Sequence, residues 1–118
     1  MWRDESYLLD MLLAGRKVQE FTRGVTWERF RADELIQHAV MHLIQTIGEA
    51  ARKVSPGFQQ AHPDIPWPAI IGMRHRLVHE YFRIIPSEVW QVVERDLPRL
   101  LPLLAPLVPP EEPSEQKG

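Results

Sequence analysis

The sequence contains no cysteine and no asparagine, and arginine outnumbers lysine 11 to 3. Without cysteine, disulfide bonds and thiolate chemistry are excluded, which fits a reducing compartment. No apolar run approaches the roughly 18 residues that a membrane-spanning helix needs. The first residues, MWRDESYLLD, are acidic where a signal peptide is basic and then apolar. We therefore expect a cytoplasmic protein that has no contact with a membrane.

The composition is that of an ordinary globular protein. Of 118 residues, 44% are hydrophobic and 25% are charged, which excludes a fully disordered chain and is enough for one core. The formal net charge is -2, so the surface as a whole is not basic. Any contact with nucleic acid must therefore be made by a local cluster of positive charge.

Apolar side chains recur at helical spacing, and no long segment alternates with a period of two. We expect helices over about residues 5–22, 32–54 and 68–81, and a last helix after a cap at Ser87. A short helical turn is expected at residues 27–30. The sequence thus predicts an all-α bundle of four main helices with short extra helices.

Prolines divide the rest of the chain. Residues 58–66 contain two of them and are typical of a connector. Three more follow at four-residue intervals from Pro98, and because interior prolines kink or end helices, we expect order to fade after about Leu104. The predicted helical domain is residues 1–106, followed by a flexible tail rich in Pro and Glu at residues 107–118.

Residues 74–83 form a locally basic segment, which we call the basic island. Its members with polar or charged side chains are Arg74, His75, Arg76, His79, Glu80, Tyr81 and Arg83. On a helix, Arg74 lies within the apolar arc, where a guanidinium is unfavourable unless it meets an anion or opens into a cleft. His79 lies about 140° around the helix from Arg74, so a second copy of the helix would be needed to bring more of these groups together.

Histidine and arginine together suit the cleavage of RNA without a metal ion. The 2′-hydroxyl attacks the adjacent phosphorus, histidine moves protons, and arginine binds the phosphate oxygens. The products would be a 2′,3′-cyclic phosphate and a 5′-hydroxyl. The alternative from the residues alone is that these are solvated side chains on a helix surface.

Three further residues outside the basic island are candidates. Glu49 is either a surface carboxylate or a supporting partner for the basic island. His38 and His42 lie one helical turn apart, as metal ligands often do, but no third ligand is evident nearby. We therefore predict no metal site and no cofactor.

The spacing Arg74, His79, Tyr81 gives the pattern R-x-x-x-x-H-x-Y, which resembles the motif of the HepT toxins in the HEPN superfamily. The flanking segments resemble that family too: IGEAARKVS at residues 47–55, HPDIPW at 62–67, IIGMR at 70–74 and DLP at 96–98. The resemblance covers roughly residues 4–104. Two positions depart from the commonest family sequence: His75 stands where asparagine is frequent, and Glu80 where glycine is frequent.

The resemblance implies a HEPN-type homodimer with the motifs facing each other across a cleft. It implies a ribonuclease that cuts tRNA or mRNA and acts as the toxin of a type VII-like toxin–antitoxin system. The implied antitoxin is a minimal nucleotidyltransferase of the MntA kind, which silences the toxin by attaching AMP to Tyr81. The implied roles are catalysis by Arg74 and His79, substrate binding by His75, Arg76 and Arg83, and support from Glu49.

Two other functions remain open from the sequence. One is a catalytically silent HEPN dimer that binds a nucleotide or serves as the scaffold subunit of a nucleotidyltransferase. The other is a purely structural helical dimer. The intact pair of Arg74 and His79 favours the ribonuclease, because a silent protein has no need of both.

Overall fold

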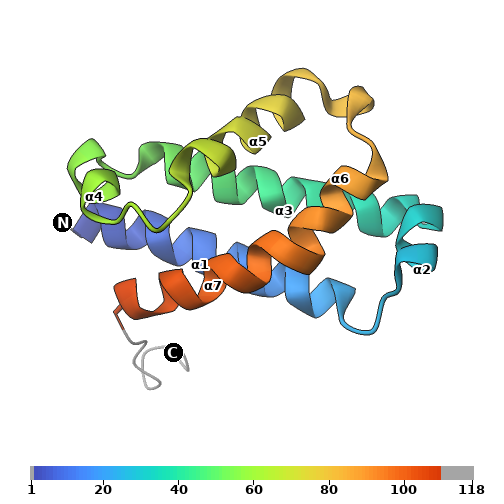
Figure 1. The fold of residues 1–118 in the computed structure, drawn as a ribbon, viewed down its shortest axis with the longest axis horizontal. Coiled ribbons are helices and arrows are strands. Elements are labelled where there is room, and N and C mark those ends of the chain that lie inside the picture. The colour runs from blue at the N-terminus through green and yellow to red at the C-terminus, as the bar shows by residue number, and fades with distance from the viewer. Residues whose placement is uncertain (1, 110–118) are drawn as a thin grey trace, which may run out of the picture.

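The computed structural model describes residues 2–109, which form helices and the short connections between them (Figure 1). No strand occurs among these residues, so the all-α prediction is confirmed. None of the described helices is long and apolar enough to cross a membrane. The predicted tail lies mostly outside the described residues, and the boundary between residues 106 and 107 stays a prediction.

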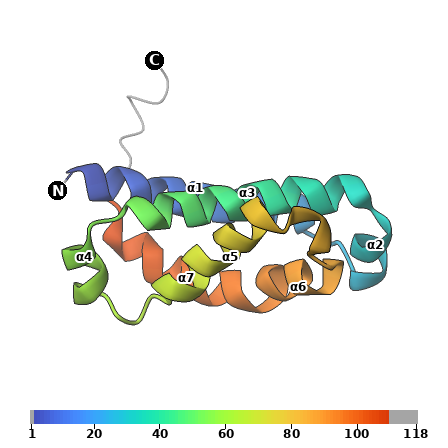
Figure 2. The ribbon, with the colours of Figure 1, turned by 90° about the horizontal axis from the view of Figure 1, so that it is seen from above.

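The long helices are arranged in two layers. Helices α1 (Trp2–Thr22) and α3 (Glu34–Lys53) run antiparallel, side by side, and form one layer (Figure 2). Helix α5 (Trp67–His79) and the stretch formed by α6 (Pro86–Gln91) and α7 (Leu97–Leu104) form the other. The contacts of α3 with α1 and α5 are the most extensive in the bundle.

Two short helices close the ends of the bundle. Helix α2 (Trp27–Ala32) confirms the predicted turn and begins at Thr26, whose side chain accepts a hydrogen bond from the Arg29 N–H at 3.2 Å. Helix α4 (Pro56–Ala61) shows that the prediction of a plain connector at residues 58–66 was wrong. Ser55 followed by Pro56 ends α3, but a serine cap before proline is also a strong signal to begin a new helix.

The buried carboxylate of Asp4 ties the start of α1 to the corner between α3 and α4. It accepts hydrogen bonds from the Ser55 N–H at 2.9 Å and from the Ser55 hydroxyl at 2.7 Å. Burial raises the pKa of Asp4, but the two hydrogen bonds outweigh it and the pKa lies below its usual value. Asp4 thus fixes where α4 departs, and α4 leads into the helix of the basic island.

The end of α5 differs from the prediction. The helix stops at His79 rather than at Tyr81, Glu80 is its last cap, and Tyr81 begins a 3-10 turn, η1 (Tyr81–Arg83). Pro86 keeps the preceding Ile85 extended, so the chain must leave the helix and turn before that point. Tyr81 therefore lies outside α5, although the helix was predicted to include it.

The cap predicted at Ser87 was also wrong, because Ser87 lies inside α6. The first free backbone N–H is that of Ile85, and it donates to the carboxylate of Glu88 at 3.2 Å. A carboxylate in the first turn satisfies an orphan N–H and opposes the positive end of the helix dipole. Glu88, and not Ser87, therefore provides the side-chain hydrogen bond at the start of α6.

A wide π turn, η2 (Val92–Asp96), joins α6 to α7. Here the Leu97 N–H donates to the Val92 carbonyl, five residues back. The turn comes directly before Pro98, which has no N–H to donate, and Pro98 and Pro102 both lie on the exposed face of α7. Helix α7 ends at Leu104, and the one further element among residues 2–109 is the 3-10 turn η3 (Ala105–Leu107).

The apolar core fills the space between the two layers. Its fully buried members come from every long helix and include Leu8, Met11, Val18, Val40, Ala51, Leu77, Leu97 and Leu104. Within it, α3 and α5 approach closely at Gly48. A Cβ atom added at Gly48 would lie 2.2 Å from the Arg74 Cβ and 3.0 Å from the Ile70 carbonyl oxygen. Only glycine at this position allows the observed distance between the two helices.

We expect Gly48→Ala to destabilise the protein by about 1–3 kcal/mol, as overpacking of a close contact does. The added methyl group meets the Cβ of Arg74 and the backbone carbonyl oxygen of Ile70. Because neither atom can move without the backbone of α5, the methyl group must push α5 away from α3. Gly72→Ala on α5 is the matched control, since nothing lies within 4 Å of the added atom. It should be neutral or stabilising by about 0.5–1 kcal/mol through helix propensity. Urea unfolding of both variants measures this, and equal stabilities would contradict the close approach.

Candidate functional site

Arg74 opens onto a polar cavity beside the α3–α5 contact. Its Nη2 lies 2.8 Å from Oε1 of Glu49 on α3, and the Arg74 side chain is 23% exposed. The cavity has a volume of about 340 Å³ and lies between α1, α3 and α5. It is lined by Tyr7, Asp10, His42, Gln45, Thr46, Glu49, Ala50, Lys53 and Arg74. The guanidinium that sequence analysis placed in an apolar arc thus meets a carboxylate at the edge of a cavity.

Glu49 is surrounded by positive charge. Besides Arg74, its carboxylate contacts Arg52 at 2.7 Å and Lys53 at 3.7 Å. The hydrogen bond from Arg52 and the attraction of the three cations lower the pKa of Glu49, and partial burial opposes this only in part. Glu49 therefore stays ionised and holds one edge of the Arg74 guanidinium. The Nε atom of Arg74 is buried and meets no acceptor among the described residues.

The two histidines of the basic island lie together at the end of α5. The rings of His75 and His79 have their centroids 4.4 Å apart, and both side chains are exposed. His79 does not line the cavity of Arg74. Within one chain, the predicted catalytic pair is therefore divided between two sides of α5.

Arg76 is held by two carboxylates. Its guanidinium pairs with both oxygens of Glu88 on α6, one of them at 3.3 Å, and with Glu80 at 3.5 Å. The hydrogen bond from Arg76 and that from the Ile85 N–H lower the pKa of Glu88. The substrate-binding role predicted for Arg76 stays a prediction. In the structure, the ion pairs of Arg76 hold the η1–α6 turn against α5.

Glu88 is a residue that the sequence reasoning missed. The available signal was its place three residues after Ile85, in the first turn of α6. Glu80, which stands where the family commonly has glycine, directs its carboxylate at Arg76. Arg83 lies exposed on η1.

Tyr81 meets a histidine of α3. Its hydroxyl is hydrogen-bonded to Nδ1 of His38, 43 residues earlier in the chain, and the two rings stack with centroids 5.5 Å apart. The sequence had suggested His38 only as a weak metal ligand with His42. No cluster of three metal-binding side chains occurs among residues 2–109. Helical spacing alone could not have paired His38 with Tyr81.

A polar stripe on α3 connects the two places where the basic island touches this helix. The stripe consists of His38, His42, Gln45, Glu49 and Lys53, which recur every three or four residues and so share one face. From His38, which meets Tyr81, to Glu49, which meets Arg74, the stripe extends about 16 Å along the helix axis. The hydroxyl of Tyr81 therefore does not lie in the Arg74 cavity of its own chain.

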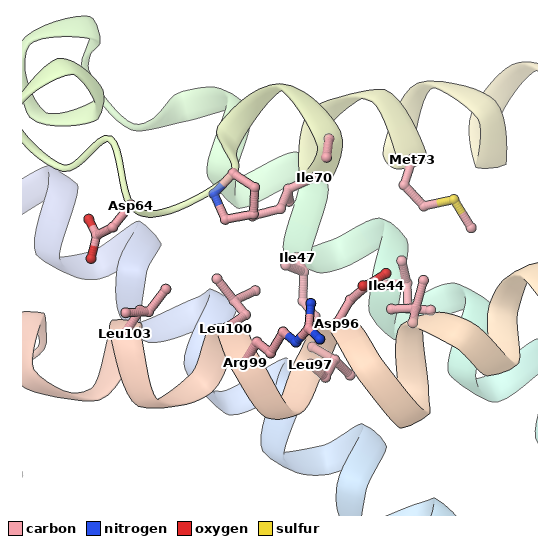
Figure 3. Close-up of a pocket in the computed structure, with 13 residues that line it drawn as sticks. Ile44, Ile47, Asp64, Ile70, Met73, Asp96, Leu97, Arg99, Leu100 and Leu103 are labelled. Atoms are coloured by element: carbon pink, nitrogen blue, oxygen red, sulfur yellow. The ribbon is translucent and has the colours of Figure 1, made fainter.

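The opposite side of α5 borders an apolar groove of about 470 Å³ (Figure 3). Ile70 and Met73 of α5 and Leu97, Leu100 and Leu103 of α7 form its two sides, with Ile44 and Ile47 of α3 between them. None of the site residues predicted from the sequence lines it. The chemistry-bearing side chains are thus gathered along the polar stripe and at the end of α5.

The chain is similar to a group of ribonucleases. The family model described as "Ribonuclease HepT-like" matches residues 11–107. "Probable ribonuclease HepT" of Thermococcus cleftensis is 36% identical over 96 residues, which are 81% of this chain and 87% of that protein. A "putative RNase" of Methanocaldococcus jannaschii is 32% identical over 81% of this chain and 88% of its own length.

A third relative, a "putative RNase" of Caldanaerobacter subterraneus, is 31% identical over 80% of this chain and 84% of its own length. Among solved structures there is no significant match. The family model covers most of the described helical residues, including the basic island and its partners on α3. The chain belongs to the HepT-like ribonuclease family.

Proposed function

We propose that this chain is the ribonuclease toxin of a toxin–antitoxin pair and that it cleaves RNA without a metal ion. The observation that carries the proposal is the fixed guanidinium of Arg74 at the mouth of a polar cavity, on the same helix as two exposed histidines. A fixed cation and an imidazole that can move a proton are the minimum that RNA cleavage by the 2′-hydroxyl needs.

Arg74 binds the phosphate at the cleavage point. Glu49 contacts one nitrogen of the Arg74 guanidinium. A guanidinium has five N–H donors, so Arg74 still has donors for phosphate oxygens. Glu49 is itself held by Arg52 and Lys53, which keeps Arg74 oriented before substrate arrives. A preoriented arginine is worth more in the transition state than a mobile one, because it need not be ordered during the reaction.

His79 moves the proton. As a base it takes the proton of the 2′-hydroxyl. The 2′-oxygen then forms a bond to phosphorus, the bond from phosphorus to the 5′-oxygen breaks, and that oxygen takes up a proton from water. The products are a 2′,3′-cyclic phosphate and a 5′-hydroxyl. His75 and Arg83 are exposed near His79 and supply further contacts to the substrate, which is tRNA or mRNA. Arg76 contributes less, since Glu88 and Glu80 already occupy its donors.

The active form is a homodimer in this proposal. Arg74 and His79 lie on different sides of α5. Within one chain, Arg74 faces the polar cavity and His79 lies outside it. A second copy facing the first would bring the histidine of one chain toward the arginine of the other. The two-fold symmetry of such a pair would create two equivalent sites.

The proposed control is nucleotidylation of Tyr81 by a cognate nucleotidyltransferase of the MntA kind, the antitoxin. AMP on Tyr81 adds bulk and negative charge at the end of the polar stripe. Because the stripe leads toward Arg74, the added bulk and charge obstruct the path by which RNA reaches that arginine. The toxin is then silent while the modification lasts.

Arg74→Ala and His79→Ala should each abolish RNA cleavage while the protein stays folded. A positioned acid–base group contributes about 100- to 10,000-fold, and the loss of His79 should fall in that range. Arg95→Ala is the control, because Arg95 lies on the exposed π turn and contacts only Gln91 and Asp96 among the described residues. Cleavage of labelled RNA is measured with and without EDTA. Inhibition by EDTA would contradict the metal-free mechanism, and full activity of both variants would favour a binding dimer.

Light scattering at micromolar concentration should give about twice the 13.8 kDa chain mass. The physical reason is that Arg74 and His79 lie apart within one chain, so a second copy is needed to complete each site. Mixing Arg74→Ala with His79→Ala protein should then restore part of the activity, because mixed dimers contain one intact composite site. A monomer that cleaves RNA would refute the shared site.

Incubation with the nucleotidyltransferase and ATP should add mass in steps of AMP, localised by peptide mapping to Tyr81. Tyr81→Phe removes only the acceptor oxygen and should resist both modification and silencing. The chain has two tyrosines, so Tyr7→Phe is the matched control and should be modified like the wild type. Silencing with AMP on another residue and none on Tyr81 would refute this control mechanism.

A further inference from the structure

The hydroxyl of Tyr81 is paired with an imidazole. Among the described residues, His38 both hydrogen-bonds this hydroxyl through Nδ1 and stacks on the phenol ring, with 25° between the planes. The two residues come from different helical segments, α3 and η1, and are held by the α3–α5 packing rather than by local sequence. An imidazole fixed on a hydroxyl is the arrangement that activates oxygen nucleophiles.

We propose that His38 is the general base for nucleotidylation of Tyr81. This inference rests on the proposed control of the toxin, and it assigns the proton-accepting group of that reaction to the toxin rather than to its partner. A phenol is a weak nucleophile while its proton is in place, so a base at the oxygen is needed for attack at neutral pH.

With the imidazole proton on Nε2, Nδ1 of His38 accepts the proton of the Tyr81 hydroxyl. The phenol oxygen forms a bond to the α-phosphorus of ATP held by the nucleotidyltransferase, and the bond from that phosphorus to the bridging oxygen breaks. Pyrophosphate leaves with the electron pair, AMP stays on Tyr81, and His38 carries the proton to solvent.

The surroundings of the pair suit a reaction with another protein. The His38 side chain is exposed. Of the large apolar side chains in the described residues, the two most exposed are Leu35, one turn before His38, at 81%, and Phe82, beside Tyr81, at 94%. These side chains give a partner apolar surface next to the hydroxyl. A macromolecule that docks on these side chains would lie beside the Tyr81–His38 pair.

The other tyrosine has a different setting, which accounts for a choice between the two. Tyr7 lines the Arg74 cavity, and the Lys53 ammonium lies 5.9 Å from its ring centroid. Within residues 2–109, no histidine ring stacks on Tyr7. Among the described residues, only Tyr81 has an imidazole hydrogen-bonded to its hydroxyl, with two exposed apolar side chains beside that pair.

The test compares His38→Gln and His38→Ala in the full chain. Glutamine keeps a hydrogen-bonding group near Tyr81 but cannot take a proton at neutral pH, whereas alanine removes both functions. With nucleotidyltransferase and ATP, we expect both variants to gain AMP about 100-fold more slowly than the wild type, or slower. His62→Gln is the control, since it removes an imidazole that stacks on Phe58 at the end of α4. Thermal unfolding checks that each variant is folded.

A second measurement needs no partner. Acetylation by N-acetylimidazole, followed at each tyrosine by peptide mass spectrometry, should be faster at Tyr81 than at Tyr7 in the wild type. In His38→Gln the rate at Tyr81 should fall to that of Tyr7, while the rate at Tyr7 stays the same. A folding defect would change both rates, whereas loss of the base changes only one.

The outcomes separate the two proposals. If the wild type gains AMP on Tyr81 and His38→Gln gains it equally fast, His38 is not the base and the control at Tyr81 stands. If only His38→Ala is slow, His38 positions the tyrosine without taking its proton, which also overturns the assignment. If the wild type gains no AMP, the control mechanism fails, and the acetylation rates then decide on His38: equal rates at Tyr81 with and without it refute its role.

Discussion

The close approach of α3 and α5 at Gly48 is the contact on which the rest of the site depends. Because no side chain separates the helices there, the Cβ of Arg74 rests against the backbone of α3 and its guanidinium reaches Glu49, the next residue along. The helices run in opposite directions, so the same contact fixes the register that brings Tyr81 to His38 about 15 Å away along α3. One glycine thus sets the positions of both functional contacts.

Carboxylates organise the positive charge of the basic island. Glu49 holds Arg74 and is kept ionised by the cations around it, while Glu88 joins Arg76 to the start of α6. Pairs that are partly exposed contribute little to stability, so their effect is mainly to orient side chains. In a chain of net charge -2, Arg74 and Arg76 of the basic island are thus each held in one orientation by a carboxylate.

Helical boundaries followed from the sequence wherever a local signal was unambiguous. The short turn predicted at residues 27–30 and the apolar periodicity of α1 and α3 correspond to the helices observed, because these features act over one or two turns. Errors arose where one signal had two meanings. Ser55 with Pro56 both ends a helix and starts the next, and a serine at position 87 was preferred over the carboxylate of Glu88, which the fold uses instead.

The sequence by itself determined the all-α class, the basic island and the family, since periodicity and motif spacing are properties of the linear chain. Tertiary structure alone decided which partner each functional group meets: Glu49 for Arg74, Glu88 for Arg76 and His38 for Tyr81. These pairs join different helices, and the last is separated by 43 residues. Their geometry depends on the register of α5 against α3, which a steric contact at a glycine sets and no periodic pattern encodes.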